Sequence, residues 1–175
     1  MTGPRKSVAS VRYAPIGIVH SPLRTPFNAP IQPIFAKHTR GTVEVFARYG
    51  SGLKGLNGFS HIILLYHFHL AGRTSLSVKP FLDSAYHGIF ATRAPVRPNP
   101  IGISVVRLRK IRGATMWVQD LDVLDGTPLL DIKPYVPQFD VRRATRIGWF
   151  KHSIHRLNRT VADERFTRAV SSSRT

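Results

Sequence analysis

Carboxylates crowd into one part of this sequence, and carboxylates are the side chains that accept protons and bind ammonium or hydroxyl groups. Five of the nine acidic residues lie in the stretch 120–140, namely Asp120, Asp122, Asp125, Asp131 and Asp140. Lys133 and Tyr135 lie in the same stretch. Such clustering on a strongly cationic protein suggests a functional site. The alternative is that these acidic residues only form turns, because Asp125-Gly126 and Pro128 are ordinary turn residues.

A rigid loop is predicted between Gly88 and Gly102. Three prolines fix its backbone within a few residues, at Pro95, Pro98 and Pro100. The loop also carries polar side chains, Arg93, Arg97 and Asn99. Because a guanidinium binds a carboxylate or phosphate through two parallel hydrogen bonds, a rigid loop with arginines is a candidate binding element.

A glycine-rich string, Gly50 to Gly55, matches the dinucleotide-binding pattern GxGxxG. Its context does not fit, because no acid lies between Glu44 and Asp83 to bind a ribose and Gly58 interrupts the helix that should follow. We therefore expect an irregular, tightly turned connection rather than a Rossmann site.

Histidines gather on one predicted strand, with His67 and His69 on one face and His61 six residues earlier. Such a set can in principle ligate a metal, but no acid is close in sequence to complete it. Histidines lining a polar pocket are the commoner case, so we expect no metal.

The chain has 175 residues with 26 Lys and Arg against nine Asp and Glu, a net charge of +17. This charge attracts polyanions, so nucleic acid is the leading partner, although a general solubility feature is the alternative. Cysteine is absent and the longest apolar run is only Ile62 to Tyr66. We therefore expect a soluble, cytoplasmic protein without disulfides and without a membrane span.

Alternating apolar residues broken by Pro, Gly and Asn predict a mainly β protein, an all-β barrel or sandwich. Strands are expected at His61 to Leu70, Ile101 to Ile111 and Thr115 to Leu124, the last two joined in a hairpin at Arg112-Gly113.

After residue 140 the period changes. Apolar residues recur at three- and four-residue steps, at Ile147, Phe150, Ile154, Leu157 and Val161. This spacing predicts a C-terminal amphipathic helix with a basic face. We divide the chain into a flexible basic arm (1–14), a barrel domain (15–140) and a basic helix and tail (141–175).

Several motifs in order resemble one known family. They are Pro15-Ile16-Gly17-Ile18, Ser21-Pro22, Pro30-Ile31-Gln32, Gly58-Phe59-Ser60-His61, Phe68-His69, the arginine loop FATR-x-P-x-RPNPIG and the block DGTP-x-LDIKPY-x-P. The sequence resembles the TsaA-like SAM-dependent methyltransferases, which act on threonylcarbamoylated adenosine beside the tRNA anticodon. The resemblance implies a single compact β-barrel without a Rossmann fold, S-adenosyl-L-methionine (SAM) as methyl donor, and a homodimer with the cofactor near the subunit interface.

The resemblance also implies site residues. The cofactor would be contacted by Pro30, Ile31, Gln32, His69, Leu70, Arg93, Leu108, Asp122, Val123, Leu124 and Asp125. Clustering beside that site makes Asp125, Asp131 and Tyr135 the catalytic candidates. The tRNA would be bound by Arg97, Asn99, Lys133, Arg142, Arg143, Arg146, Lys151, Arg156 and Arg159. Two alternatives are a non-enzymatic basic RNA-binding barrel and a SAM-dependent methyltransferase of a small metabolite.

Overall fold

The computed structural model describes residues 10–27 and 36–167. Six antiparallel strands close into a barrel in the order β1-β2-β7-β6-β3-β8. Their bounds are β1 Gly17–His20, β2 Arg40–Val45, β3 His61–His67, β6 Ile101–Arg112, β7 Thr115–Gln119 and β8 Thr127–Pro134. A separate two-stranded sheet pairs β4 Ser77–Val78 with β5 His87–Gly88. The predicted mainly β barrel is confirmed.

The described helices are short. One α-helical turn, α1 Pro137–Asp140, follows β8, and the others are 3-10 helices. The latter are η2 Ala47–Leu53, η3 Leu56–Gly58, η4 Ile89–Ala91, η5 Gly148–His152, η6 Ile154–Arg159 and η7 Glu164–Phe166. No helix in the described ranges is long and apolar enough to cross a membrane.

Period-two alternation builds the barrel interior, because successive side chains of a strand point to opposite faces. On β3, Ile62, Leu64 and Tyr66 point inward and are buried. They pack with residues of other strands such as Val106 and Leu129 in one core cluster. Each fully buried aliphatic side chain contributes about 1.5–3 kcal/mol to folding.

The predicted hairpin is present: β6 and β7 pair around Gly113, whose φ is 57°. Two strands are shorter than expected. β3 ends at His67 because the chain then turns, with the amide of His69 donating to the carbonyl of His67 and the amide of Ala71 donating to the carbonyl of Phe68. β7 ends at Gln119 because Asp120 has a φ of 65°, which is incompatible with a strand.

The expected continuous C-terminal amphipathic helix is wrong in form. Residues 148–166 instead form three 3-10 pieces, η5, η6 and η7. Gly148 has a φ of 58°, and Ser153 separates η5 from η6 with a ψ of −10° at a φ of −121°. Phe166 packs into a buried cluster and Phe150 lines a pocket, whereas Ile154 and Val161 are 48% and 49% exposed, so the apolar residues do not form one buried helix face.

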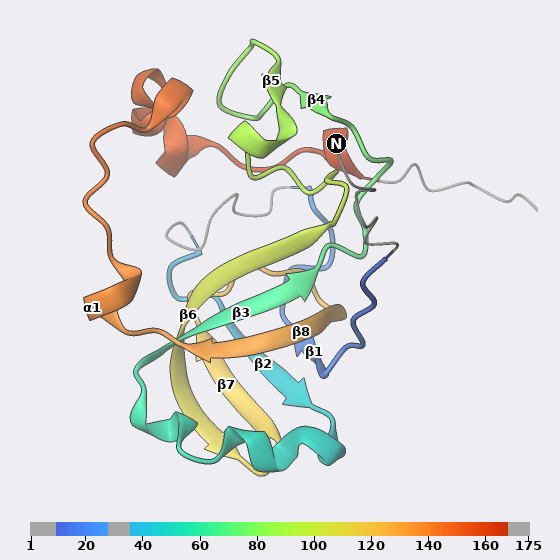
Figure 1. The fold of residues 1–175 in the computed structure, drawn as a ribbon, viewed down its shortest axis with the longest axis vertical. Coiled ribbons are helices and arrows are strands. Elements are labelled where there is room, and N and C mark those ends of the chain that lie inside the picture. Colours follow the sequence, from blue (N-terminus) through green and yellow to red (C-terminus); the bar gives the residue numbers. More distant parts are fainter. Residues whose placement is uncertain (1–9, 28–35, 168–175) are drawn as a thin grey trace, which may run out of the picture.

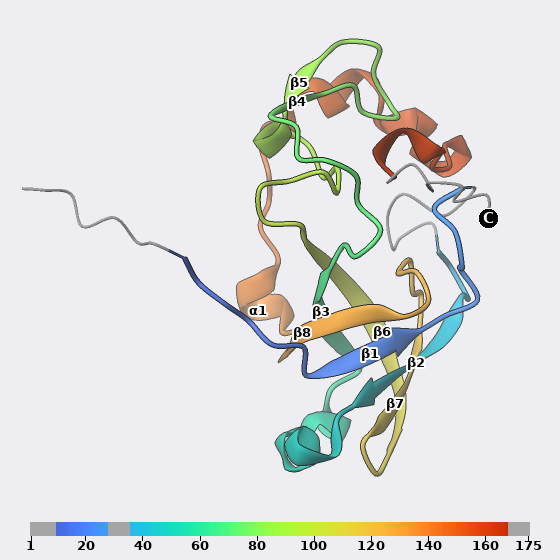
Figure 2. The same cartoon turned by 90° about the vertical axis from the view of Figure 1, so that its right-hand side faces the viewer.

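The two ends of the barrel are covered differently (Figures 1 and 2). One end is covered by η2 and η3, which contain the glycine-rich string as the irregular connection expected. The other end faces β4, β5, η4 and the C-terminal 3-10 pieces, which lie together above it in both views. The candidate site lies at this second end.

Candidate functional site

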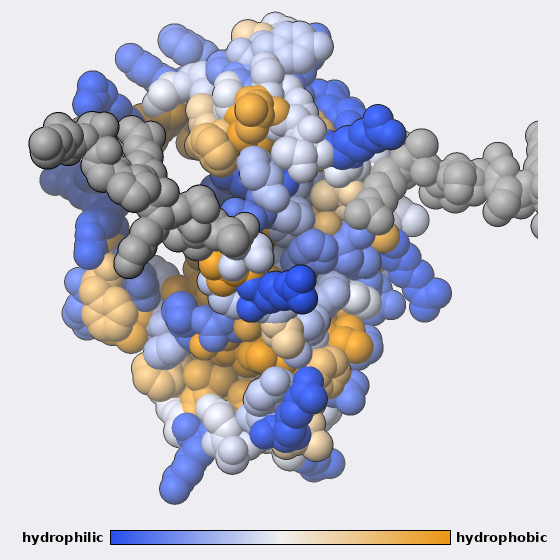
Figure 3. Space-filling model, turned by 45° about the vertical axis from the view of Figure 1, so that its right-hand side comes forward, coloured by the Kyte–Doolittle hydropathy of each residue, from blue (hydrophilic) through white to orange (hydrophobic). Residues whose placement is uncertain are grey.

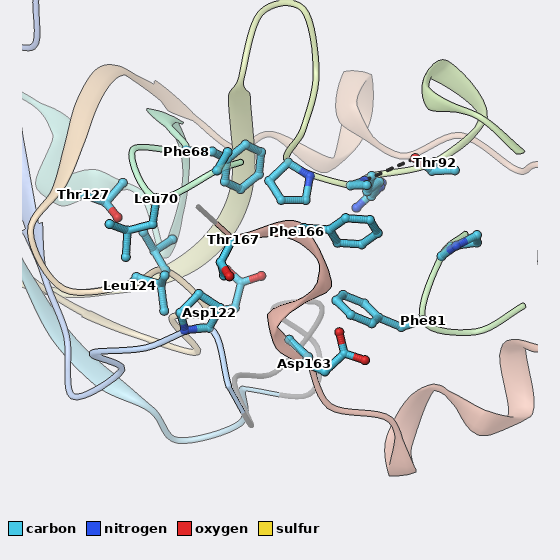
Figure 4. A pocket seen from close by; sticks show the side chains of 18 of the residues that line it. Phe68, Leu70, Phe81, Thr92, Asp122, Leu124, Thr127, Asp163, Phe166 and Thr167 are labelled. Carbon is cyan, nitrogen blue, oxygen red and sulfur yellow. Dashed lines mark hydrogen bonds between the residues drawn. The ribbon is translucent and has the colours of Figure 1, made fainter. Parts of the chain in front are cut away.

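A pocket of about 210 Å³ lies between this end of the barrel and the C-terminal segment. One side is formed by strand ends and by the connections between them, including Tyr66, Phe68, His69, Leu70, Asp122, Val123, Leu124 and Thr127. The other side is formed by Pro80, Phe81, Leu82, Trp149, Phe150, Ala162, Asp163, Phe166 and Thr167. Figure 4 shows Leu70, Leu124 and Asp122 on the first side, and Phe81, Phe166 and Asp163 on the second.

The residues on the barrel side of the pocket lie where β3 and β7 end. The turn after β3 brings His69 and Leu70 to the pocket. Asp120 has a left-handed backbone conformation that ends β7, and the segment from Asp122 to Leu124 then lines the pocket. The Ser21 hydroxyl donates to the carbonyl of Val123 at 2.6 Å and fixes this connection.

Side-chain contacts fasten the C-terminal side. The Trp149 ring stacks on His87 with centroids 4.8 Å apart, and its Nε1 donates to the carbonyl of Ala91 at 2.9 Å. Arg156 donates to the carbonyl of Leu82 at 2.5 Å. Phe166 is buried and meets Phe81 edge-on at 5.1 Å. The segment therefore forms a fixed wall of the pocket.

Asp122 is the most perturbed carboxyl group of the pocket. Burial raises its pKa to about 6, against a partial lowering by the hydrogen bond from Ser104 and by the charge of Arg93. The Ser104 hydroxyl donates to Asp122 Oδ1 at 2.6 Å. This residue is therefore ionised at neutral pH and still has an unusually high affinity for a proton.

Behind Asp122 lies a buried polar chain that the sequence analysis missed. The hydroxyls of Tyr66 and Ser104 are 3.0 Å apart. Burial, with the nearby Asp122 charge, raises the pKa of Tyr66 well above its ordinary value, so Tyr66 keeps its proton. Gly102 faces the Tyr66 ring across the β3–β6 pair, and a Cβ there would clash with it. The available signal was Ser104, a polar residue at an inward position of a barrel strand.

His69 and Asp163 also line the pocket, and the pKa of each is shifted. Burial, with a contribution from His67, lowers the pKa of His69, whose Nδ1 lies 3.3 Å from the Thr127 hydroxyl. The Arg165 side chain binds both oxygens of Asp163, at 2.9 and 2.6 Å, and lowers the pKa of that carboxyl group.

The structure brings together six of the residues predicted for the cofactor, and they come from three separate chain segments. These are His69, Leu70, Arg93, Asp122, Val123 and Leu124. Leu108 lies near the other end of the barrel, where its amide donates to Ser60 and its side chain packs on the core. Pro30, Ile31 and Gln32 lie outside the described residues.

The three catalytic candidates do not line the pocket. Asp125 accepts a hydrogen bond from the Ser21 amide at 3.1 Å and stabilises the neighbouring turn. Asp131 pairs with Lys133 at 2.7 Å, and the Tyr135 ring lies 6.2 Å from His61 at the start of β3. β8 begins at the pocket and carries Asp131 and Tyr135 toward the opposite end of the barrel.

The residues predicted to bind RNA differ in whether their side chains already make hydrogen bonds within the protein. Asn99, Arg143, Arg146 and Lys151 are exposed. Lys133 and Arg142 are also exposed, but Lys133 pairs with Asp131 and Arg142 donates to the carbonyl of Val141. Arg97 donates to the carbonyls of Ile89 and Thr92, and Arg156 donates to Leu82, so these two arginines hold loops together. The side chain of Arg159 lies outside the described residues.

No group of three or more His, Cys, Asp or Glu side chains suited to a metal ion occurs in the described part of the chain. His69 leaves the strand that carries His61 and His67, so the three rings do not share one strand face.

The protein is a closed six-stranded β-barrel with a pocket at one end, and a buried carboxylate and an arginine loop line that pocket. The sequence profile described as "tRNA-methyltransferase O N-terminal domain" matches residues 18–141. The chain belongs to this family.

Individual proteins are also similar to this chain. A probable S-adenosyl-L-methionine-binding protein of Pyrococcus abyssi is 56% identical over 154 residues, covering 88% of this chain and 84% of the relative. A tRNA (adenine(37)-N6)-methyltransferase of Mus musculus is 35% identical, over 78% of this chain but 33% of its own length. The crystal structure of TrmO from Pseudomonas aeruginosa superposes with a TM-score of 0.67 at 40% identity, covering 80% of this chain and 62% of that one.

Proposed function

We propose that the protein transfers a methyl group from SAM to N6 of adenine 37 in tRNA, the threonylcarbamoylated adenosine beside the anticodon. The observation that carries the proposal is the pocket, which gathers six predicted cofactor residues in a chain of the tRNA-methyltransferase O family. The names of the mouse and Pseudomonas relatives support the same reaction.

The described pocket residues fit SAM chemically. The donor carries a carboxylate, an ammonium, ribose hydroxyls and an adenine. Arg93 suits the carboxylate, the peptide groups of the segment 122–124 suit the ammonium or the hydroxyls, and the apolar walls suit the adenine. When bound, SAM supplies an electrophilic methyl group on a sulfonium.

A tRNA substrate agrees with the charge of +17. An anticodon loop is already single-stranded, so moving its base into a pocket costs less than flipping a base out of a duplex. The exposed basic residues Arg142, Arg143, Arg146 and Lys151 follow the barrel and are proposed to bind phosphates. Such a substrate also favours a cytoplasmic location.

A homodimer is supported by an apolar stripe on the outer face of β6. Ile101, Ile103 and Val105 alternate there and are 40%, 55% and 37% exposed. On the paired strand β3, Leu65 and Ile63 lie opposite Ile103 and Val105. Figure 3 shows apolar side chains gathered over the barrel half of the molecule, with hydrophilic ones around them. Exposed patches of this kind commonly mark an interface.

The test is to incubate the purified protein with labelled SAM and either cellular tRNA or an unmodified transcript, and to identify the nucleosides by mass. Methylated threonylcarbamoyladenosine from cellular tRNA alone is expected. SAM binding without transfer to either RNA would point to a small-metabolite substrate. Absence of SAM binding would contradict the enzyme and favour the non-enzymatic RNA-binding barrel.

A further inference from the structure

Methyl transfer to an exocyclic nitrogen releases a proton, and the pocket offers a place for it. We infer that the side chain of Asp122, which accepts a hydrogen bond from Ser104, accepts the proton from the nitrogen that receives the methyl group. The inference rests on the proposed function and deepens it by naming a reacting residue outside the three catalytic candidates expected from the sequence.

Two carboxyl groups lie among the described residues that line the pocket, Asp122 and Asp163. Asp163 is held by Arg165 through both oxygens, and a carboxylate bound by a guanidinium is a weak proton acceptor. Asp122 is buried at the barrel end, and its Oδ1 accepts a hydrogen bond from a neutral group, the Ser104 hydroxyl, at 2.6 Å. Of the two, Asp122 is the one suited to accept a proton.

The hydrogen bonds fix the direction of the polar chain when Asp122 is ionised. The Ser104 hydroxyl has a single proton and donates it to Asp122 Oδ1. The 3.0 Å contact with Tyr66 therefore has Tyr66 as donor. An ionised carboxylate has about four lone-pair sites, so Asp122 retains capacity to accept another proton.

The charged and titratable groups around Asp122 are compatible with this role. Tyr66 from β3 remains protonated, and His69 from the following turn has a lowered pKa and is neutral at pH 7. Arg93 lowers the pKa of Asp122 and burial raises it, with about 6 as the result. A base with this pKa is ionised at neutral pH and binds a proton far better than an exposed aspartate.

The step balances without a further reactant. The nitrogen lone pair forms the new N–C bond, the C–S bond breaks, and its electron pair stays on sulfur, which loses its positive charge. The N–H proton passes to the Asp122 carboxylate and then to water when the product leaves.

The decisive experiment measures single-turnover methyl transfer to cellular tRNA at saturating SAM between about pH 5 and 8. Asp122→Asn keeps the shape of the side chain but cannot take the proton. We expect SAM affinity, measured by calorimetry, to stay close to that of the wild type, while the rate falls by at least about 100-fold and loses its rise with pH.

Ser104→Ala provides a second variant that leaves the carboxylate in place. Because the lost hydrogen bond stabilised the charged form, the midpoint of the pH–rate profile should move to higher pH, which a merely structural role would not cause. Asp140→Asn, on the short helix α1 outside the pocket, is the matched control and should leave the profile unchanged.

The outcomes separate the inference from the proposed function. Loss of SAM binding by Asp122→Asn in proportion to activity would make Asp122 only a cofactor ligand and overturn the inference. If the midpoint of the pH–rate profile does not move in Ser104→Ala, the inference is also overturned. Ser104→Ala alone decides the question if Asp122→Asn does not fold. A wild-type protein that binds SAM without methylating tRNA would instead contradict the proposed function.

Discussion

At the scale of single residues, Asp122 shows that a site group can oppose folding. Its pKa of about 6 lies above the ordinary 3.8, so its ionisation favours the unfolded chain. Stability from this group is present below about pH 4 and is lost as the pH rises toward 6. Asp122→Asn should therefore have a higher free energy of unfolding at pH 7, by up to roughly 3 kcal/mol, with the difference vanishing near pH 4 in urea titrations.

Asp83→Asn provides the control of opposite sign. The hydrogen bond from His87 lowers the pKa of Asp83, so this carboxylate adds stability at neutral pH that is lost as the pH falls. Asp83→Asn should gain no stability at pH 7. An Asp122→Asn protein less stable than the wild type at that pH would contradict the argument.

At the scale of elements, the C-terminal pieces are predicted to belong to the cofactor site. Trp149→Ala removes the stack on His87 and the hydrogen bond to Ala91, which together fasten one wall of the pocket. We expect SAM to bind about tenfold more weakly, the equivalent of one lost hydrogen bond of about 1.4 kcal/mol, and faster amide exchange across 148–166. Phe139→Ala, at a side chain 60% exposed on α1, is the control. Unchanged SAM affinity in Trp149→Ala would show that the wall is not part of the site.

At the scale of the whole molecule, the apolar stripe on β6 should govern assembly. Ile103→Lys places a charge at the centre of the stripe, where burial in an interface is costly, while an outward position leaves the barrel core intact. We expect a dimer for the wild type and a monomer for the variant in light scattering. Val141→Lys, at another exposed apolar residue, should leave the dimer intact. If Ile103→Lys is still a dimer, the apolar stripe on β6 is not the dimer interface.

The net charge of +17 should make binding of tRNA depend on salt. Changing Arg142, Arg143 and Arg146 to alanine should weaken tRNA binding and reduce its dependence on salt, because each lost phosphate contact lowers the slope of log affinity against log salt by about 0.7–0.9. Filter binding over a salt series measures this slope. Arg97→Ala is a useful comparison, since its guanidinium already binds Ile89 and Thr92. A slope unaffected by the triple change would exclude this surface.

The barrel could be predicted from the sequence, and so could the grouping of six cofactor candidates around one pocket. Period-two alternation fixes which side chains of β3 and β6 are buried, and the Arg112-Gly113 turn fixes the hairpin, because both are local properties of the backbone. The motifs placed His69, Leu70, Arg93 and the block after Asp120 in one site, and the pocket gathers them.

The surroundings of each carboxylate and the cover of the pocket could not be predicted from the sequence, because both depend on contacts between distant segments. Asp122, Asp125 and Asp131 look alike in sequence, and they differ because one is buried against Ser104, one caps a turn and one pairs with Lys133. The spacing after residue 140 predicted a helix, yet Gly148 and the anchoring of Trp149 and Phe166 divide it into short turns. Burial and long-range contacts set both outcomes, and neither is encoded in the period of a local segment.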